Sequence, residues 1–436
     1  MEELHGRQKV VQKAEGVLLD DSYQLKEALQ LTTTKVICQR CGSRFSKEES
    51  RLPNQDYYCP YCIQLGRVTG QSYLVFQEEK TRNTRPVTFT WQGTLTPAQE
   101  EVSQHILENY QHNKNSLVWA VTGSGKTEMI FAVLRYCLQN GGRVAIASPR
   151  IDVCRELYPR IHEVFPKEQT LLLYGDSNEA YRYNALTICT THQLFHFYRA
   201  FDLLIVDEID AFPYDGDTRL AFAQKNALKK KGKLIYLSAT PPIHLLKAIE
   251  GTFCIEKLPL RFHKRPLVVP QLVWYEQWQY CYQSNWKIRK LITYLKKLLC
   301  DNDVLIFCPS IRYMQKLYKK VRQFFNPQEM TSVSSQDELR EEKVQSMREG
   351  AYRILFCTTI LERGVTFEHI SVIIMGANHK IFRKSVLVQM AGRVDRKGDY
   401  QHGQVLFFYD QQTQAIRDAC EEIKKMNCLA KEWLSR

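Results

Sequence analysis

The sequence predicts an α/β protein with two tandem parallel-sheet lobes, preceded by a small module that holds four cysteines. Short, nearly continuous apolar segments alternate with helical stretches, and this pattern occurs twice along the chain. Strands of a parallel sheet that is covered on both faces have this texture. Two Cys-x₂-Cys pairs near the N-terminus predict the separate module. With 436 residues, the chain is long enough for two or three domains.

We expect five segments along the chain. Residues 1–35 form an N-terminal segment of unknown role, and residues 36–91 hold the cysteine module and a connector. Residues 92–255 form the first lobe, residues 256–285 a proline-punctuated linker, and residues 286–436 the second lobe.

The expected strands are the short apolar segments between helical stretches. In the first lobe they cover residues 116–121, 144–148, 171–174, 186–190, 203–206 and 234–237. In the second lobe they cover residues 304–308, 354–357, 372–375 and 405–408. Alternation over residues 87–91 predicts a short strand at the end of the connector, and the lysine run 229–231 is interpreted as a solvated helix end.

Composition and charge limit the classes of binding partner and the cellular compartment that we expect for this protein. The formal net charge is +13, which favours DNA, RNA or an anionic membrane surface as a partner. No apolar run reaches the length of about 18 residues that a membrane-spanning helix needs, and residues 1–10 have no signal-peptide core. We therefore expect a cytosolic protein whose fourteen cysteines are mostly buried thiols rather than disulfides.

A phosphate-binding loop is predicted at residues 120–127, AVTGSGKT, between an expected strand and an expected helix. Gly123 and Gly125 let the backbone turn and present N–H groups to phosphate oxygens. Lys126 can reach the β- and γ-phosphates of a nucleotide, and the Thr127 hydroxyl can bind Mg²⁺. Ala120 stands where the general pattern has its first glycine, ahead of the turn that binds phosphate.

A pair of carboxylates supports the same chemistry. The apolar segment 203–206 leads directly into Asp207 and Glu208. A carboxylate at the C-terminal end of a parallel strand lies on the ligand-binding edge of the sheet. We expect Asp207 to hold Mg²⁺ and Glu208 to orient and deprotonate the attacking water, so that the chain hydrolyses ATP.

These motifs resemble those of superfamily-2 helicases. Residues 207–210, DEID, resemble the DEAD box, and further motifs follow in the order that such helicases have. They cover residues 95–99, 147–150, 190–193, 238–240, 305–310, 358–366 and 389–396. The resemblance implies two RecA-like lobes over residues 92–410.

The resemblance also implies roles for individual residues. Gln99 would read adenine, and Thr122, Ser124 and Gly364 would contact the nucleotide. In the last motif, Gln389 begins a segment in which Arg393 and Arg396 would act as arginine fingers on the γ-phosphate. Residues 238–240, SAT, would couple hydrolysis to lobe movement. Thr366 stands where many helicases have an aspartate.

The cysteine spacing predicts a structural zinc site. Cys38, Cys41, Cys59 and Cys62 form two Cys-x₂-Cys pairs that are separated by seventeen residues. Each pair can form a knuckle, and two knuckles complete the tetrahedral four-thiolate site that Zn²⁺ prefers. Four protein ligands leave no open position for a substrate, so the expected role of Zn²⁺ is structural.

A zinc module ahead of a compact helicase core resembles the ComFA family, as do residues 207–213 (DEIDAFP), 258–266 and 358–367. The resemblance implies an ATP-driven motor that draws transforming single-stranded DNA through the cytoplasmic membrane in competent bacteria. It implies as partners a ComEC-type channel, a phosphoribosyltransferase-like companion and DNA-loading proteins, with peripheral attachment at the inner face of the membrane. The oligomeric state stays open.

Three alternatives remain at this point. A replication-restart helicase resembling PriA would be longer and would have its cysteines between the lobes. A DEAD-box RNA helicase would show DEAD and HRxGRxxR, whereas this chain has DEID and QMAGRVDR. A non-catalytic zinc-ribbon nucleic-acid adaptor would not be expected to keep Lys126, Glu208 and Arg393 together. ATP turnover with and without DNA separates a motor from an adaptor.

Overall fold

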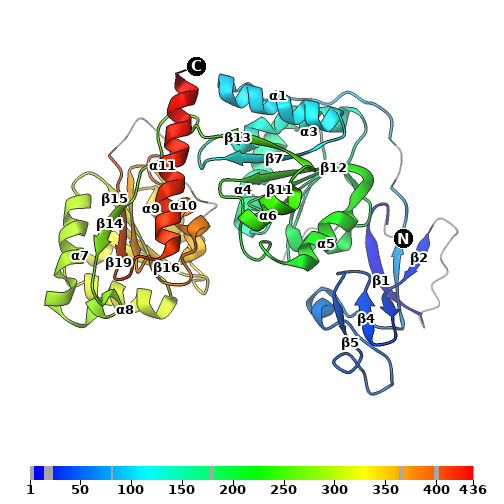
Figure 1. The fold of residues 1–436 in the computed structure, drawn as a ribbon, viewed down its shortest axis with the longest axis horizontal. Coiled ribbons are helices and arrows are strands. Elements are labelled where there is room, and N and C mark those ends of the chain that lie inside the picture. Colours follow the sequence, from blue (N-terminus) through cyan, green and yellow to red (C-terminus); the bar gives the residue numbers. More distant parts are fainter. Residues whose placement is uncertain are drawn as a thin grey trace. The chain divides into compact units, whose positions relative to one another are not determined.

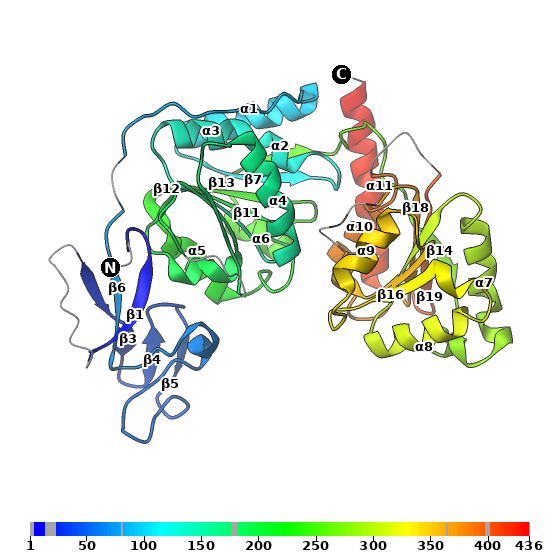
Figure 2. The same cartoon turned by 180° about the vertical axis from the view of Figure 1, so that it is seen from behind.

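The computed structural model describes residues 4–13, 23–79, 82–175, 181–362, 365, 367–396 and 402–435. Its contacts divide the chain into two units, residues 1–119 with 126–257 and residues 120–125 with 258–436. Each unit contains one large parallel sheet between helices, and the first also carries the N-terminal module (Figures 1 and 2). The predicted α/β class with two parallel-sheet lobes is confirmed.

The N-terminal module contains two small antiparallel sheets. One sheet has the order β1-β6-β2. Its central strand, β6, follows the four cysteines in the sequence, whereas both of its partner strands precede them. The other has the order β3-β4-β5 and carries the first cysteine pair. The strands are β1 (Gln8–Gln12), β2 (Gln24–Glu27), β3 (Leu29–Leu31), β4 (Lys35–Cys38), β5 (Arg44–Ser46) and β6 (Ser72–Phe76). Residues 1–35, which had no interpretation from sequence, therefore supply three of the six strands.

A buried arginine attaches this module to the first lobe. Arg143 is only 1% exposed, and its Nη1 donates to the Glu79 carboxylate at 2.9 Å and to the His5 carbonyl at 3.0 Å. Its Nη2 donates to the Tyr181 hydroxyl at 3.0 Å. A buried charge is tolerated when it is paired and hydrogen-bonded in this way. Arg7 adds a second contact, because its guanidinium lies 3.9 Å from the centre of the Tyr181 ring.

The first lobe has a seven-stranded sheet with the order β13-β7-β12-β11-β8-β10-β9. Its strands are β7 (Asn115–Ala120), β8 (Val144–Ser148), β9 (Thr170–Leu173), β10 (Leu186–Thr190), β11 (Phe201–Asp207), β12 (Leu228–Ser238) and β13 (Phe253–Leu258). Its helices are α1 (Pro97–Gln111), α2 (Lys126–Met129), α3 (Phe131–Gln139), α4 (Ile151–Val164), α5 (Thr218–Ala227) and α6 (Ile243–Ile249). The strands from β7 to β9 in this order run parallel, so their C-terminal ends share one edge.

The second lobe has a six-stranded, fully parallel sheet with the order β14-β19-β18-β15-β17-β16. Its strands are β14 (Gln271–Trp274), β15 (Asp303–Phe307), β16 (Met330–Val333), β17 (Ile354–Cys357), β18 (Ile370–Met375) and β19 (Val405–Tyr409). Its helices are α7 (Asn285–Leu298), α8 (Ile311–Val321), α9 (Arg340–Arg348), α10 (Lys384–Ala391) and α11 (Gln414–Leu434). The central strands are buried along almost their whole length, which explains their nearly continuous apolar sequences.

Three expectations about local structure were wrong. Residues 87–91 form no strand; the segment is irregular, and the alternation reflects packing, because the Trp91 ring lies edge-on to Phe131 at 5.4 Å. The lysines at 229–231 belong to β12, which begins directly after α5 ends. The expected linker 256–285 contains β14, the outer strand of the second sheet. In the part of the chain that the structure describes, no helix is long and apolar enough to cross a membrane.

Candidate functional site

The predicted phosphate loop follows β7 at the C-terminal edge of the first sheet. Gly123 and Gly125 have φ angles of 79° and 77°, in the left-handed region that favours glycine. The Ser124 N–H donates to the Val121 carbonyl at 3.2 Å and closes the turn. The loop leads into α2, which begins at Lys126, and then into α3, so helical N–H groups follow the turn. This strand–turn–helix arrangement is the one that cradles phosphates.

The two predicted catalytic carboxylates lie at the C-terminal end of β11, a strand that β12 separates from β7. Asp207 is the last residue of β11, and its Oδ1 accepts the N–H of Glu208 at 2.8 Å. Glu208 has a φ of 55°, which is uncommon for a residue with a side chain and marks a sharp turn at the strand end. Since only β12 separates β7 from β11, the ends of these two strands, which carry the phosphate loop and Asp207, are two strand spacings or about 10 Å apart.

A third acidic residue connects this turn to the SAT motif. Asp210 is 5% exposed, and its two carboxylate oxygens accept hydrogen bonds from Ser238 Oγ and Thr240 Oγ1, each at 2.7 Å. Thr240 also donates its backbone N–H to Ser238 Oγ at 3.0 Å. Two buried hydrogen bonds therefore join the predicted catalytic turn to the SAT motif. The sequence motif contained Asp210 but gave no sign of these two partners.

Gln99 lies in the first turn of α1 and takes part in a capping box. Its Oε1 accepts the N–H of Thr96 at 2.8 Å, and the Thr96 hydroxyl accepts the N–H of Gln99 at 3.4 Å. The Gln99 side chain is 2% exposed. Because Oε1 is engaged in the cap, a contact between Gln99 and adenine would use its amide Nε2. The role of Gln99 as an adenine reader stays a prediction.

The arginine motif of the second lobe lies at the end of α10. Gln389 is in the last turn of this helix, and Arg393 follows it, 3% exposed, with its Nε donating to the Glu362 carbonyl at 3.2 Å. Arg396 is half-buried. Gly364 lies outside the described residues. The action of these arginines on a γ-phosphate stays a prediction.

Another arginine, which the sequence interpretation missed, supports this motif from residues 258–266. Arg261 is 3% exposed, and its guanidinium donates to three main-chain carbonyls of the turn that carries Arg393: Gly392 at 3.0 Å, Val394 at 2.8 Å and Asp395 at 2.9 Å. Burial lowers the pKa of Arg261 to about 10, so the side chain remains charged at neutral pH. Only its place in a basic linker was visible in the sequence.

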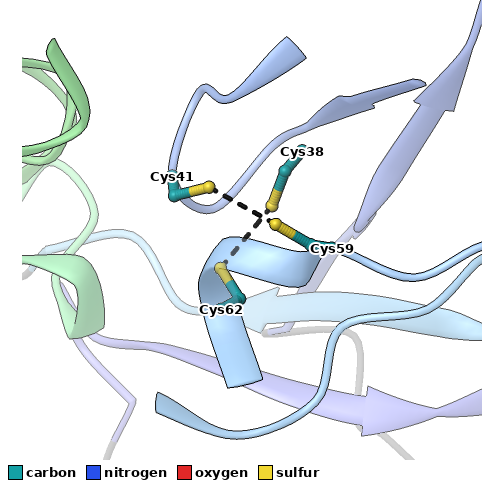
Figure 3. A group of neighbouring side chains, drawn as sticks. All are labelled: Cys38, Cys41, Cys59 and Cys62. Atoms are coloured by element: carbon teal, nitrogen blue, oxygen red, sulfur yellow. Dashed lines mark hydrogen bonds between the residues drawn. The ribbon is translucent and has the colours of Figure 1, made fainter. Parts of the chain in front are cut away.

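The four predicted zinc ligands meet in the N-terminal module (Figure 3). Cys38 ends β4 and Cys41 follows in the turn, whereas Cys59 and Cys62 flank the start of a 3₁₀ helix at Pro60–Leu65. All four sulfur atoms are buried and lie within 4.8 Å of one another. Cys38 and Cys62 are 3.8 Å apart, and Cys41 and Cys59 are 3.6 Å apart. These separations exclude disulfides, whose sulfurs lie about 2.05 Å apart.

The cluster fits a tetrahedral Zn²⁺ ion. Four sulfurs at about 2.3 Å from a central ion would be separated from one another by about 3.8 Å, close to the two spacings above. The turn of the first knuckle needs a glycine, because Gly42 has a φ of 74° and a Cβ there would lie 2.5 Å from the Phe222 ring. The N-terminal module thus packs directly on α5 of the first lobe.

A buried arginine sits beside the sulfur atoms. Arg40, between the first two cysteines, is 3% exposed, and its Nε donates to Cys62 Sγ at 3.3 Å. Its terminal nitrogens donate to the carbonyls of Cys62, Leu65 and Gly66 at 2.6–3.0 Å. A hydrogen bond with Cys38 lowers the pKa of the Cys62 thiol, and the positive charge of Arg40 lowers it further. Arg40 therefore favours the thiolate form that a metal ion needs.

Comparisons with known proteins agree with this geometry. The family model of the type III restriction enzyme res subunit matches residues 92–243, and that of the helicase conserved C-terminal domain matches residues 286–398. A competence protein ComFA from Streptococcus pneumoniae is 41% identical over 418 residues, which cover 95% of this chain and 96% of the relative. This chain belongs to the ComFA family. A second ComFA, from Bacillus subtilis, is 37% identical over 417 residues, covering 93% and 88% of the two chains.

Membership of the ComFA family confirms the resemblance that the motifs and the zinc module indicated, and the two domain matches make the chain a superfamily-2 helicase. Among solved structures, Dbp5 from Saccharomyces cerevisiae, bound to RNA and ADP BeF3, has a TM-score of 0.55 at 16% identity. The match covers 76% of this chain and 91% of Dbp5. At this identity it shows the fold alone, two RecA-like lobes.

Proposed function

We propose that this chain is an ATP-dependent single-stranded DNA translocase that drives the import of transforming DNA during natural competence. One observation carries the proposal: a phosphate loop and a carboxylate turn follow two strands of one sheet that only β12 separates, in a chain that matches ComFA proteins almost from end to end. A non-catalytic adaptor has no use for this arrangement.

In this proposal the residues of the first lobe bind and activate the nucleotide. The N–H groups of the loop that contains Thr122, Gly123, Ser124 and Gly125 bind phosphate oxygens, and Lys126 neutralises the β- and γ-phosphates. Thr127 and Asp207 would hold Mg²⁺, which supplies positive charge to the phosphates during transfer. Glu208 takes a proton from the attacking water.

The second lobe supplies the remaining charge. Arg393 and Arg396 stabilise the charge that develops on the γ-phosphate, and Gln389 and Gly364 complete the nucleotide site. Asp210 ties the hydrolytic turn to Ser238 and Thr240, which gives a route from hydrolysis to a change in the SAT motif. A motor needs such a link, because each turnover must alter the contacts to the strand.

The proposed partners follow from charge and family. The net charge of +13 suits a surface that binds the phosphate backbone of a nucleic acid without sequence specificity. We place the protein in the cytoplasm at the inner face of the membrane, with a ComEC-type DNA channel and competence companion proteins as partners. The zinc module, outside the two lobes, is available to bind DNA or one of these proteins.

The decisive experiment compares ATP turnover without nucleic acid and with single-stranded DNA, duplex DNA and RNA. Single-stranded DNA should give the largest stimulation, and the stimulation should weaken as salt rises. Lys126→Ala should abolish turnover and weaken ATP binding, whereas Glu208→Gln should bind ATP and fail to hydrolyse it. Glu250→Gln, at an exposed glutamate of the same lobe, is the control and should behave as wild type. Equal rates under all four conditions would reject a nucleic-acid-driven motor.

The import role needs a separate test in competent cells. A strain with Lys126→Ala should bind labelled DNA at its surface and internalise little of it. Normal internalisation would reject the import role and leave an ATPase that acts elsewhere in DNA processing.

A further inference from the structure

The second lobe carries a hollow lined by two exposed tryptophans and two lysines. Trp286 is 82% exposed and Trp274 is 54% exposed, and with Lys287 and Lys290 they line a space of about 430 Å³. Tryptophan is normally largely buried, because its ring is the largest apolar surface that a residue can remove from water. Two such rings left open at one hollow point to a planar or apolar ligand.

The walls of the hollow are fixed to each other. Trp274 ends β14, and its ring lies edge-on to Tyr409 of the neighbouring strand at 5.6 Å. The Lys290 Nζ donates to the Trp274 carbonyl at 2.5 Å, and the Tyr275 hydroxyl donates to the Lys287 carbonyl at 2.7 Å. These bonds join the end of β14 to the first turns of α7. A ligand would therefore meet a surface that is already ordered, which limits the entropy lost on binding.

The hollow lies on the edge of the sheet that carries the helicase motifs of this lobe. All six strands are parallel, so the C-terminal end of β14 shares an edge with those of β15 and β17. The motif at residues 305–310 begins within β15 and continues past its end, and the motif at residues 358–366 follows β17 directly. Three strand spacings separate β14 from β15, which corresponds to about 14 Å along the edge.

The charge around the hollow selects an anionic ligand. The helix α7 contains five lysine or arginine residues over Asn285–Leu298 and no acidic residue. Lys287 and Lys290 lie in the hollow itself, and Glu276 is the acidic residue that lines it. A ligand with a planar ring and a negative backbone satisfies both the indoles and the lysines. Nucleic acid has this combination, since every base presents a flat face and every linkage carries a charge.

We propose that a single DNA strand stacks a base on Trp286 and Trp274 and places its phosphates on Lys287 and Lys290. The inference rests on the proposed function and adds to it a contact outside the helicase motifs. The site holds any base, because stacking is tolerant of sequence. The site extends the proposed DNA-binding surface of the second lobe beyond the ends of β15 and β17.

The test measures the binding of a fluorescent oligothymidylate by anisotropy, together with ATP turnover. Trp286→Ala should weaken binding about 5- to 150-fold, as removal of one stacked base does, and Trp274→Ala should weaken it as well. The control is Tyr280→Ala, at an aromatic residue about as exposed as Trp274, on the preceding 3₁₀ helix at Trp278–Gln283, that does not line the hollow. Turnover without DNA should stay at the wild-type rate in all three variants, which shows that they fold.

The lysines have a matched control on the same helix. Lys287→Gln with Lys290→Gln should reduce the slope of log binding constant against log salt by about 0.7 for each DNA phosphate that the variant no longer neutralises. Lys296→Gln with Lys297→Gln, at exposed positions near the other end of α7, should leave the slope unchanged.

Wild-type affinity in Trp286→Ala, or equally weakened binding in Tyr280→Ala, would overturn the site and leave the hollow as a docking surface for a protein. If the wild-type protein neither bound DNA nor was stimulated by it, the proposed function would fail first. The two failures are therefore distinguishable.

Discussion

Replacing Arg40 with methionine should weaken zinc binding without disturbing the motor. Methionine keeps most of the buried length of the side chain, but it cannot donate to Cys62 Sγ or to the three carbonyls that the guanidinium reaches. A four-thiolate zinc centre has a net charge of about −2, and Arg40 is the cation that donates a hydrogen bond to one of its sulfurs.

The size of the effect can be bounded from the geometry. A full charge pair at 3.3 Å interacts with about 5 kcal/mol at an effective dielectric constant of about 20. Much of this is offset by the cost of burying the guanidinium. Removing a partner that hydrogen-bonds a metal ligand typically weakens metal binding 10- to 100-fold, or about 1.4–2.8 kcal/mol. We expect Arg40→Met to fall in this range.

The assay is competition for Zn²⁺ against a coloured chelator under reducing conditions. Arg44→Met, at an exposed arginine of β5 in the same module, is the matched control and should bind zinc as wild type does. Arg40→Lys should fall between the two, because it keeps the charge but cannot reach all three carbonyls. Wild-type zinc affinity in Arg40→Met would refute the argument that this charge stabilises the thiolates.

Three further outcomes are expected. Asp210→Ala should lower ATP turnover at least tenfold while ATP binding stays within a few-fold, as measured by turnover and nucleotide titration, because it removes both acceptors that join this turn to Ser238 and Thr240. Arg261→Met should lower turnover about 10- to 100-fold, whereas Lys264→Met, at an exposed neighbour, should not; equal rates in both would show that the turn holds Arg393 unaided. Burial lowers the pKa of His196 to about 4, so the unfolded chain binds its proton more readily, and stability that is complete above about pH 6.5 should fall as the pH drops toward 4. Urea unfolding should show wild type losing about 2 kcal/mol more than His196→Gln between pH 7 and pH 5, and equal decreases would contradict this.

The sequence predicted the central strands well and the outer ones poorly. β8, β10 and β17 were expected at the bounds that the structure has, because strands covered on both faces are apolar throughout. β13, β14 and β16 were missed. They lie at or near the sheet edges, where one face can be polar, and their short mixed sequences carry no distinct period.

The residues of the candidate site were also predicted only in part. The phosphate loop and the four cysteines were predictable because phosphate and zinc chemistry fix both the residue type and the spacing. Asp210, Arg261 and Arg40 act through residues that are distant in sequence or through main-chain carbonyls, which can accept from any donor that the fold brings near. The spacing of residues within one segment does not indicate such partners, so they could be identified only from the three-dimensional structure.

The pairing of β1 with β6 also has a consequence for how the chain is made. β3, β4 and β5 pair with their neighbours in sequence, so this sheet and the first knuckle can form soon after they leave the ribosome. β1 must wait for β6, which lies beyond all four cysteines, and Arg143 is translated later still. Metal capture can therefore come early in synthesis, and closure of the surrounding sheet comes next. Attachment to the first lobe comes last, so the four thiols can bind a metal ion before the part of the first lobe that packs on the module has been made.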